Sequence, residues 1–249
     1  MNDAGIWNGY MKSYDFLTQI DGYTQNMRDI AAAANVNAGT HVLDGGSGTG
    51  NLSLLLKSRG ADVMSCDFCQ SALNAHRAKD PSAKLVHASL EEPLPFENGQ
   101  FGVVCCASVL FALSQAGCKL AVREFRRVLA PGGRLVLTVP SSEARLDRLV
   151  KMHWNTVIRS HGVIGGLPRV VRDFPALAKV LYYNKKLKEL PDWQGWHRFN
   201  ESELVELVTG AGFTGVNCGR TYGDVFFLIT ASNAVTANRV AETAGLAAV

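Results

Sequence analysis

The feature that most constrains this chain is a glycine-rich turn directly after a short apolar run. Residues 42–50 have the sequence VLDGGSGTG, and a helical pattern over 51–58 follows at once. Glycine is needed where a backbone bends sharply and must let a ligand approach closely. The pattern therefore predicts a strand, a ligand-binding loop and a helix, in that order.

The spacing of the glycines narrows the class of ligand. A dinucleotide-binding fingerprint needs glycine at its first, third and sixth places, and counting from Gly46 gives Gly48 and then Asn51, so the sixth place fails. A phosphate-binding P-loop needs Gly-Lys followed by Ser or Thr, which this segment lacks. What remains is the pattern Asp-x-Gly-x-Gly-x-Gly, which runs from Asp44 to Gly50.

The stretch from about 40 to 140 alternates short apolar runs with longer helical patterns, which is typical of βαβ units in a mostly parallel sheet. Near the C-terminus, Asn200 followed by Glu203 forms a capping signal for one more helix. With 47% hydrophobic and 19% charged residues, the chain can bury a core of this kind. The predicted strands are 41–44, 62–66, 84–87, 101–107, 133–139, 216–221 and 225–230, and the main predicted helices are 51–58, 116–130 and 200–212.

Three features in register resemble the class I S-adenosylmethionine-dependent methyltransferases, in particular those of ubiquinone and menaquinone biosynthesis. The segment from Asp44 to Gly50 is similar to motif I of that family, and the acidic Asp67 stands seventeen residues further on, at the end of the predicted second strand. The segment LAPGG at 129–133 resembles the family's approach to its fifth strand. Together these features cover roughly residues 40 to 140, and the closing helix and hairpin extend the match to about 231.

The resemblance implies a Rossmann-like α/β fold with a doubly wound sheet of seven strands. The sheet is expected to be mostly parallel, with a C-terminal antiparallel hairpin and a helical cap inserted after strand five. The expected divisions are an N-terminal helical lid (1–38), the S-adenosylmethionine-binding core (39–140), the cap for the acceptor (141–200), the completion of the core (201–231) and a tail (232–249).

The resemblance also implies S-adenosyl-L-methionine as the cofactor. Asp67 is expected to accept both ribose hydroxyls, and Phe68 to lie on the adenine. Tyr14 belongs to a stripe with Trp7 and Tyr10, which either packs against the core or closes over the cofactor. The expected cofactor-binding residues are Tyr14, Asp44, Gly46, Ser47, Gly48, Gly50, Asp67, Phe68, Ser89, Leu90 and Ala107.

Several positions depart from the family's pattern. Ser89 stands where an Asp often holds the adenine amino group, so that contact passes to backbone groups. Gly102 replaces a frequent Asp, and Phe111-Ala112 replaces a frequent His that can act as a base. His153 and His197 are therefore the candidate catalytic bases, although each is also explained as a packed or surface histidine.

The sequence between 141 and 200 carries 11 Lys and Arg against 5 Asp and Glu. This excess favours an acceptor with an acidic group, or one presented by an acidic carrier. A pair of solvated amphipathic helices explains the same charges equally well. The expected acceptor is a small, partly apolar molecule, methylated by metal-independent in-line displacement. The absence of an acidic cluster after the fourth predicted strand argues against a metal site.

Two other functions stay open at this point: an RNA methyltransferase and a non-catalytic S-adenosylmethionine-binding protein. The net charge of +3 is too small to argue for nucleic acid as a partner. The longest apolar run, 103–113, is shorter than the ~20 residues of a membrane span, so no integral membrane segment and a cytoplasmic location are expected. A lipid acceptor reached from the membrane surface remains open.

Overall fold

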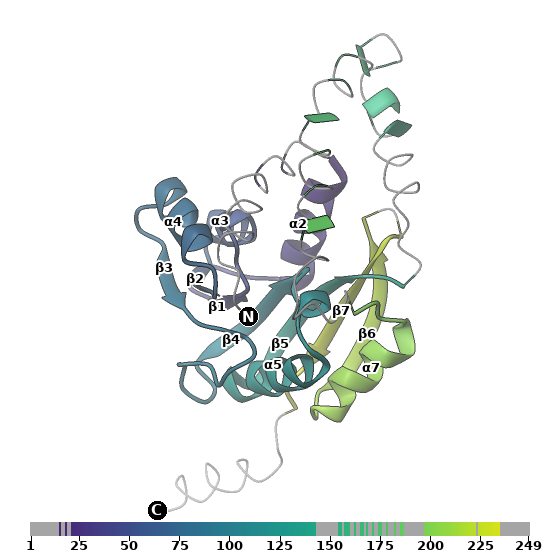
Figure 1. Cartoon of the computed structure of the whole chain (residues 1–249). Helices are drawn as coiled ribbons and strands as arrows, with labels where there is room; N and C mark the ends of the chain where they lie inside the picture. Colours follow the sequence, from purple (N-terminus) through teal and green to yellow (C-terminus); the bar gives the residue numbers. More distant parts are fainter. Residues whose placement is uncertain are drawn as a thin grey trace, which may run out of the picture.

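The computed structural model describes residues 21–142, 197–222 and 224–234, together with Asp15, Thr18 and scattered positions between 154 and 186. Within these residues the chain forms a seven-stranded sheet in the order β3-β2-β1-β4-β5-β7-β6 (Figure 1). The strands are β1 (His41–Gly45), β2 (Asp62–Asp67), β3 (Lys84–His87), β4 (Phe101–Ala107), β5 (Leu129–Pro140), β6 (Thr214–Thr221) and β7 (Phe226–Ser232). The described helices are α2 (Asp21–Ala34), α3 (Asn51–Ser58), α4 (Gln70–Lys79), the 3-10 helix η2 (Leu110–Ala112), α5 (Gln115–Val128) and α7 (Glu201–Gly210).

The pairing of the strands confirms the predicted Rossmann-like architecture. Strands β1 to β5 pair in parallel, whereas β7 runs antiparallel to both β5 and β6. Much of the predicted cap at 141–200 lies outside the described residues, as do Tyr14, His153 and residues 235–249 of the predicted tail. The division of the chain into lid, core, cap and tail stays a prediction.

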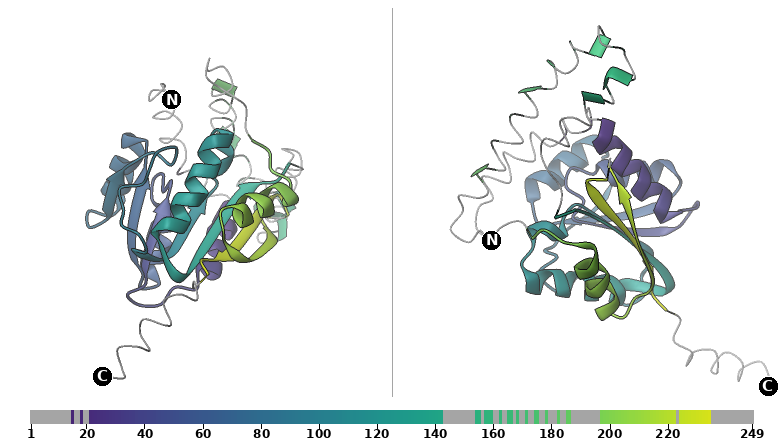
Figure 2. Two further views of the ribbon diagram at one scale, coloured as in Figure 1. Left: turned by 90° about the horizontal axis from the view of Figure 1, so that it is seen from below. Right: turned by 90° about the vertical axis from the view of Figure 1, so that its right-hand side faces the viewer.

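Helices cover both faces of the sheet (Figure 2). Successive residues of a strand point to opposite faces, so neighbouring apolar residues enter two different cores. One core joins α2 and α3 to the sheet through Met27, Ile30, Leu52, Leu56, Val42, Val103, Cys105 and Val136. The other joins α5 and α7 to the sheet through Val122, Phe125, Leu204, Val208, Leu43, Val104, Leu135 and Leu137.

The loop after β1 shows why the sequence needs glycine there. Gly46, Gly48 and Gly50 have φ values of 74°, 54° and 84°, a region that residues with a Cβ atom seldom adopt. A Cβ atom on Gly46 would also lie 2.5 Å from Cγ2 of Val109. The loop is therefore held against the segment after β4, and the carboxyl ends of β1 and β4 meet.

The predicted start of the fifth strand was wrong. Strand β5 begins at Leu129 rather than at Gly133, and its pairing with β4 shifts register between Phe101 and Val103. The Pro-Gly-Gly segment thus forms an irregularity inside the strand. Asn233 holds it in place, because its carbonyl accepts from the Gly132 N–H at 2.7 Å and its N–H donates to the Gly133 carbonyl at 2.9 Å.

The predicted capping signal before the last helix is present. The Asn200 side chain accepts from the Glu203 N–H at 2.9 Å, and the Glu203 carboxylate accepts from the Asn200 N–H at 2.9 Å. At the start of α7, the side chain of each residue thus accepts a hydrogen bond from the backbone N–H of the other. The helix ends at Gly210, two residues before the predicted end.

Candidate functional site

A cavity of about 340 Å³, the strand-end cavity, lies at the carboxyl ends of β1, β2 and β4. Open α/β sheets bind their ligands at this edge. Gly50 does not line it; this residue is the N-cap of α3. The expected cofactor residues that line the cavity are Asp44, Gly46, Ser47, Gly48, Asp67, Phe68, Ser89, Leu90 and Ala107.

Two backbone N–H groups fix the Asp67 carboxylate in the wall of this cavity. One carboxylate oxygen accepts from the Gly48 N–H at 2.8 Å, and the other accepts from the Cys69 N–H at 2.8 Å. The residue is 7% exposed. Burial raises the pKa of Asp67, and the two backbone N–H groups oppose this rise. Each oxygen keeps a further lone pair, so the carboxylate can accept two hydroxyl groups of a ligand.

Asp44 places a second carboxyl group in the same wall. Burial raises the pKa of Asp44 to about 7, the hydrogen bond from Ser53 opposes the rise, and the charge of Asp67 adds to it. The Ser53 hydroxyl donates to Asp44 Oδ2 at 2.5 Å and lies 2.8 Å from the Ser65 hydroxyl. A cationic ligand beside this pair would favour the ionised form of Asp44.

The charged residues of the cavity wall all have the same sign. Asp44, Asp67, Glu91 and Glu92 line it, and no Lys, Arg or His stands among its described lining residues. Such a wall is complementary to a positively charged ligand. Phe68, with 36% of its surface exposed, offers an aromatic face at the same place.

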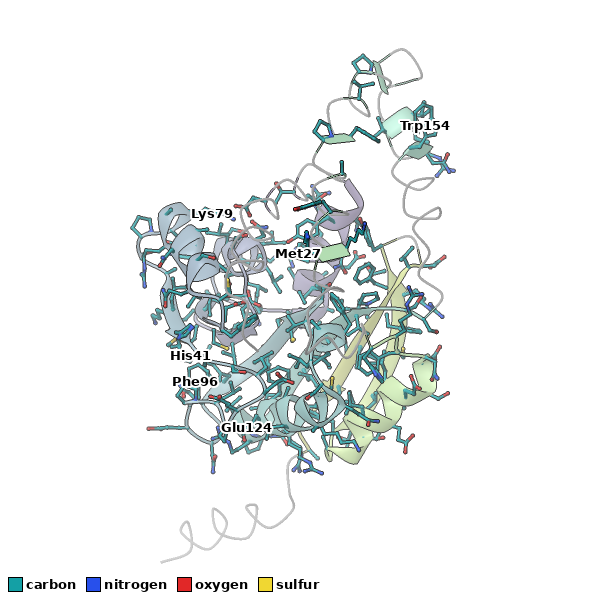
Figure 3. The ribbon with its side chains drawn as sticks, viewed as in Figure 1. Met27, His41, Lys79, Phe96, Glu124 and Trp154 are labelled. Atoms are coloured by element: carbon teal, nitrogen blue, oxygen red, sulfur yellow. The ribbon has the colours of Figure 1, made fainter. Side chains whose placement is uncertain are left out.

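Several lining residues were not predicted from the sequence. Tyr23 and Met27 come from α2, which precedes β1 in the sequence and lies outside the glycine-rich motif. Met27 is labelled in Figure 3. Ser108 follows β4 with φ of 57°, an unusual value for a residue other than glycine. Thr49 stands inside the motif and Asn51 follows it directly, and these positions could have identified both residues. The other unpredicted lining residues are Leu52, Glu91, Glu92, Ala88, Val109, Phe111, Ala112 and Leu113.

His197, one of the two candidate bases, lies elsewhere. Its ring lines a second cavity of about 370 Å³, the helix cavity, between α5 and α7. The ring packs edge-on against Phe199 with the centroids 4.2 Å apart, and the backbone N–H of His197 donates to the Phe111 carbonyl at 2.9 Å. His197 is not among the residues that line the strand-end cavity.

Two cysteines stand on either side of Asp67 at the end of β2. Cys66 and Cys69 are both buried and free, and burial raises the pKa of Cys66 to about 12. A thiol with so high a pKa is a poor nucleophile at neutral pH. In the part of the chain that the structure describes, no three His, Cys, Asp or Glu side chains are grouped so as to hold a metal ion.

Comparison with known proteins gives consistent results. A family described as "Methyltransferase domain" matches residues 43–137. The demethylmenaquinone methyltransferase of Thermus thermophilus is 32% identical over 182 residues, which cover 66% of this chain and 81% of that protein. The enzyme of the same name from Staphylococcus aureus strain JH9 is 31% identical over 236 residues, which cover 88% of each chain.

Solved structures show the same fold. An S-adenosylmethionine-dependent methyltransferase of Thermotoga maritima, described as a possible histamine N-methyltransferase, superposes with a TM-score of 0.60 at 16% identity, covering 92% of this chain and 98% of that one. The 1,6-didemethyltoxoflavin-N1-methyltransferase of Burkholderia thailandensis, solved with S-adenosylhomocysteine, gives a TM-score of 0.56 at 18% identity, covering 90% and 88%.

Together, the fold, the glycine loop and the sequence relatives define the class of this protein. The chain belongs to the class I S-adenosylmethionine-dependent methyltransferases of the menaquinone-biosynthesis type. It is an enzyme that methylates a small molecule, and the comparisons do not favour an RNA methyltransferase or a non-catalytic binding protein. No described helix has the length and apolar character needed to cross a membrane.

Proposed function

We propose that the strand-end cavity binds S-adenosylmethionine and that the enzyme transfers the methyl group to a reduced, quinone-type acceptor. The observation that carries the first part is the Asp67 carboxylate, which two backbone N–H groups fix at the end of β2. A carboxylate held in this way can accept both hydroxyls of a ribose. Phe68, which follows it, can pack on the adenine ring.

The remaining walls fit the donor as well. The donor carries a sulfonium and an ammonium group, and the wall provides Asp44 and Asp67 but no basic side chain among its described residues. The glycine loop has no side chain at Gly46 and Gly48, so its backbone can approach the donor closely.

When bound, the donor supplies an electrophilic methyl group. The residues of this chain then have three tasks: to bind the donor, to align it with the acceptor and to exclude water. Ala107, Val109, Phe111 and Leu113 line the cavity along β4 and the segment after it. Their apolar surfaces suit an apolar acceptor ring and keep water from the line of attack.

Two arguments support the quinone-type acceptor. The curated relatives are named demethylmenaquinone methyltransferases, and they cover most of this chain. A displacement at a sulfonium methyl also needs an electron-rich nucleophile, which the reduced hydroquinone ring provides and the oxidised quinone does not. The acidic group predicted from the charges of 141–200 depends on residues that mostly lie outside the described set, and it stays a prediction.

A transfer assay tests the acceptor. The purified enzyme is incubated with methyl-labelled S-adenosylmethionine and either a short-chain demethylmenaquinol, the oxidised quinone, or bulk RNA. Label is expected in the quinol alone. Label in RNA with none in the quinol would contradict the proposed acceptor, and label in the oxidised quinone under strictly oxidising conditions would contradict the argument from electron density.

A further inference from the structure

Four polar side chains from three separate parts of the chain converge at the rim of the strand-end cavity. Oδ1 of Asp15 accepts hydrogen bonds from Thr49 Oγ1 at 2.5 Å, from Lys79 Nζ at 2.7 Å and from Asn51 Nδ2 at 3.3 Å. Asp15 is 34 residues from Thr49 and 64 residues from Lys79 in the sequence. The tertiary fold, rather than a local turn, therefore assembles this cluster.

Two of the three hydrogen-bond donors of the cluster line the cavity. Thr49 and Asn51 both line it, and Thr49 is 1% exposed. Asn51 Nδ2 also lies 3.3 Å from the hydroxyl of Tyr23, another lining residue. Lys79, labelled in Figure 3 in the last turn of α4, donates to Asn51 Oδ1 at 2.9 Å. A hydroxyl, an amide N–H and an ammonium that meet at one point are suited to bind a carboxylate.

The methyl donor needs such a group. Besides its sulfonium and ammonium groups it carries one carboxylate, and the described cavity wall otherwise presents Asp44, Asp67, Glu91 and Glu92. A carboxylate placed against these side chains without a cation would be repelled. Lys79 brings a positive charge to the rim through its bond to Asn51.

We propose that Thr49, Asn51 and Lys79 bind the carboxylate of the methyl donor, and that Asp15 occupies this position until the donor arrives. This inference rests on the proposed function of the cavity. Two carboxylates that share the same three hydrogen-bonding side chains repel each other. The carboxylate of the methyl donor and that of Asp15 therefore exclude one another. The side chains of Asp15 and Lys79 are 41% and 27% exposed, and ion pairs this exposed are weak. The methyl donor can therefore displace Asp15, at a cost of about threefold to tenfold in affinity.

Calorimetric titration tests the inference with two ligands: S-adenosylhomocysteine, and its analogue in which hydrogen replaces the carboxylate. Asp15→Asn removes the competing charge, so it should tighten binding of S-adenosylhomocysteine about threefold to tenfold and leave the analogue within about twofold. In the Asp15→Asn protein, a further Lys79→Met change should weaken S-adenosylhomocysteine by about tenfold. The analogue should again be unaffected.

Asp80→Asn is the matched control. Asp80 follows Lys79 directly and pairs with Lys57 at 2.6 Å, but neither Asp80 nor Lys57 lines the strand-end cavity. This change should leave the affinity for both ligands unchanged.

Two results would overturn the inference. Weaker binding of both ligands to Asp15→Asn would show that Asp15 holds the loaded site closed, and equal effects of Lys79→Met on the two ligands would remove its role toward the carboxylate. Wild-type protein that binds neither ligand would contradict the proposed function itself, whereas wild-type binding with variants that do not discriminate the ligands would contradict this inference alone.

Discussion

The strand-end cavity and the helix cavity have nearly the same volume, about 340 and 370 Å³, but very different walls. The strand-end cavity is built from loops that follow β1, β2, β3 and β4, and it holds carboxylates fixed by backbone N–H groups. The helix cavity is lined by residues of α5, α7 and the segment before α7, and its lining includes the basic Lys119 and Arg123 as well as the acidic Glu203 and Glu206. Volume therefore does not identify the site. The site is identified instead by polar groups that backbone N–H groups hold in place and by a glycine loop whose backbone can approach a ligand closely at the edge of the sheet.

The largest expected effect comes from adding one carbon to the glycine loop. Gly46→Ala places a Cβ atom 2.5 Å from Val109 Cγ2, at a φ of 74°. The loop must move, so donor affinity should fall by at least about 100-fold, and the protein should also lose about 1–3 kcal/mol of stability. Titration calorimetry and denaturant unfolding measure the two effects.

The helix cavity provides the matched control for that change. Gly210 lines the helix cavity and has open space around its Cβ position. Gly210→Ala should leave donor affinity unchanged and, at the end of α7, alter stability by less than about 1 kcal/mol. If Gly210→Ala reduced donor affinity as strongly as Gly46→Ala, the loss in Gly46→Ala would not be evidence that the donor binds in the strand-end cavity.

The next effect is a dependence of donor affinity on pH. Asp44 has a pKa of about 7 in the folded protein, against 3.8 in the ordinary carboxyl. A cationic donor favours ionised Asp44, so affinity should rise by roughly threefold to tenfold between pH 6 and pH 8, with proton uptake by buffer on binding. Removing the Ser53 hydroxyl by Ser53→Ala should raise the pKa of Asp44 further and shift this rise to higher pH. An affinity independent of pH in both proteins would show that Asp44 does not face the donor.

The same pKa shift predicts how stability depends on pH. The folded-state pKa of Asp44 lies above the unfolded value, so the folded protein holds this proton where the unfolded chain has released it. The contribution of Asp44 to the free energy of unfolding therefore decreases as pH rises from about 4 to about 7, and it levels off above that range. Asp44→Asn should remove this component from a comparison of denaturant unfolding at pH 5 and pH 8. If the free energy of unfolding of Asp44→Asn changed between pH 5 and pH 8 as much as that of wild type, a group other than Asp44 would be responsible for the pH dependence.

The smallest expected effect belongs to the helix cavity. His197→Ala removes an edge-on contact with Phe199, which should lower stability by about 1 kcal/mol. Donor affinity and turnover should both stay within about twofold of wild type. A fall in turnover of more than about tenfold with donor affinity intact would instead support the predicted role of His197 as a base.

Most of the sheet could be predicted from the sequence because its strands carry their own signals. The predicted and observed bounds agree for 84–87 and 101–107, where apolar runs end at polar residues. The start of β5 could not be predicted in the same way. Its first residues are fixed by Asn233, about a hundred residues away along the chain, and no local pattern contains that contact.

The site divides along the same line. Asp44, Gly46, Gly48 and Asp67 stand at the spacing typical of the family, so the sequence predicted all four of them as site residues. Tyr23 and Met27 reach the cavity only because α2 packs against the sheet. The cluster around Asp15 depends on residues up to 64 positions apart, and its donors become neighbours only in the folded protein.

The most direct test of the donor site is a titration of S-adenosylmethionine into wild-type protein, Asp67→Asn and the control Asp62→Asn. Asp62 lies at the other end of β2, where it pairs with Lys84 at 2.6 Å, outside the strand-end cavity. Wild type and Asp62→Asn should bind alike, and Asp67→Asn should lose at least about 100-fold in affinity, because each hydrogen bond to a buried carboxylate contributes about 1.5–3 kcal/mol. Undiminished binding by Asp67→Asn would contradict the assignment of the strand-end cavity as the donor site.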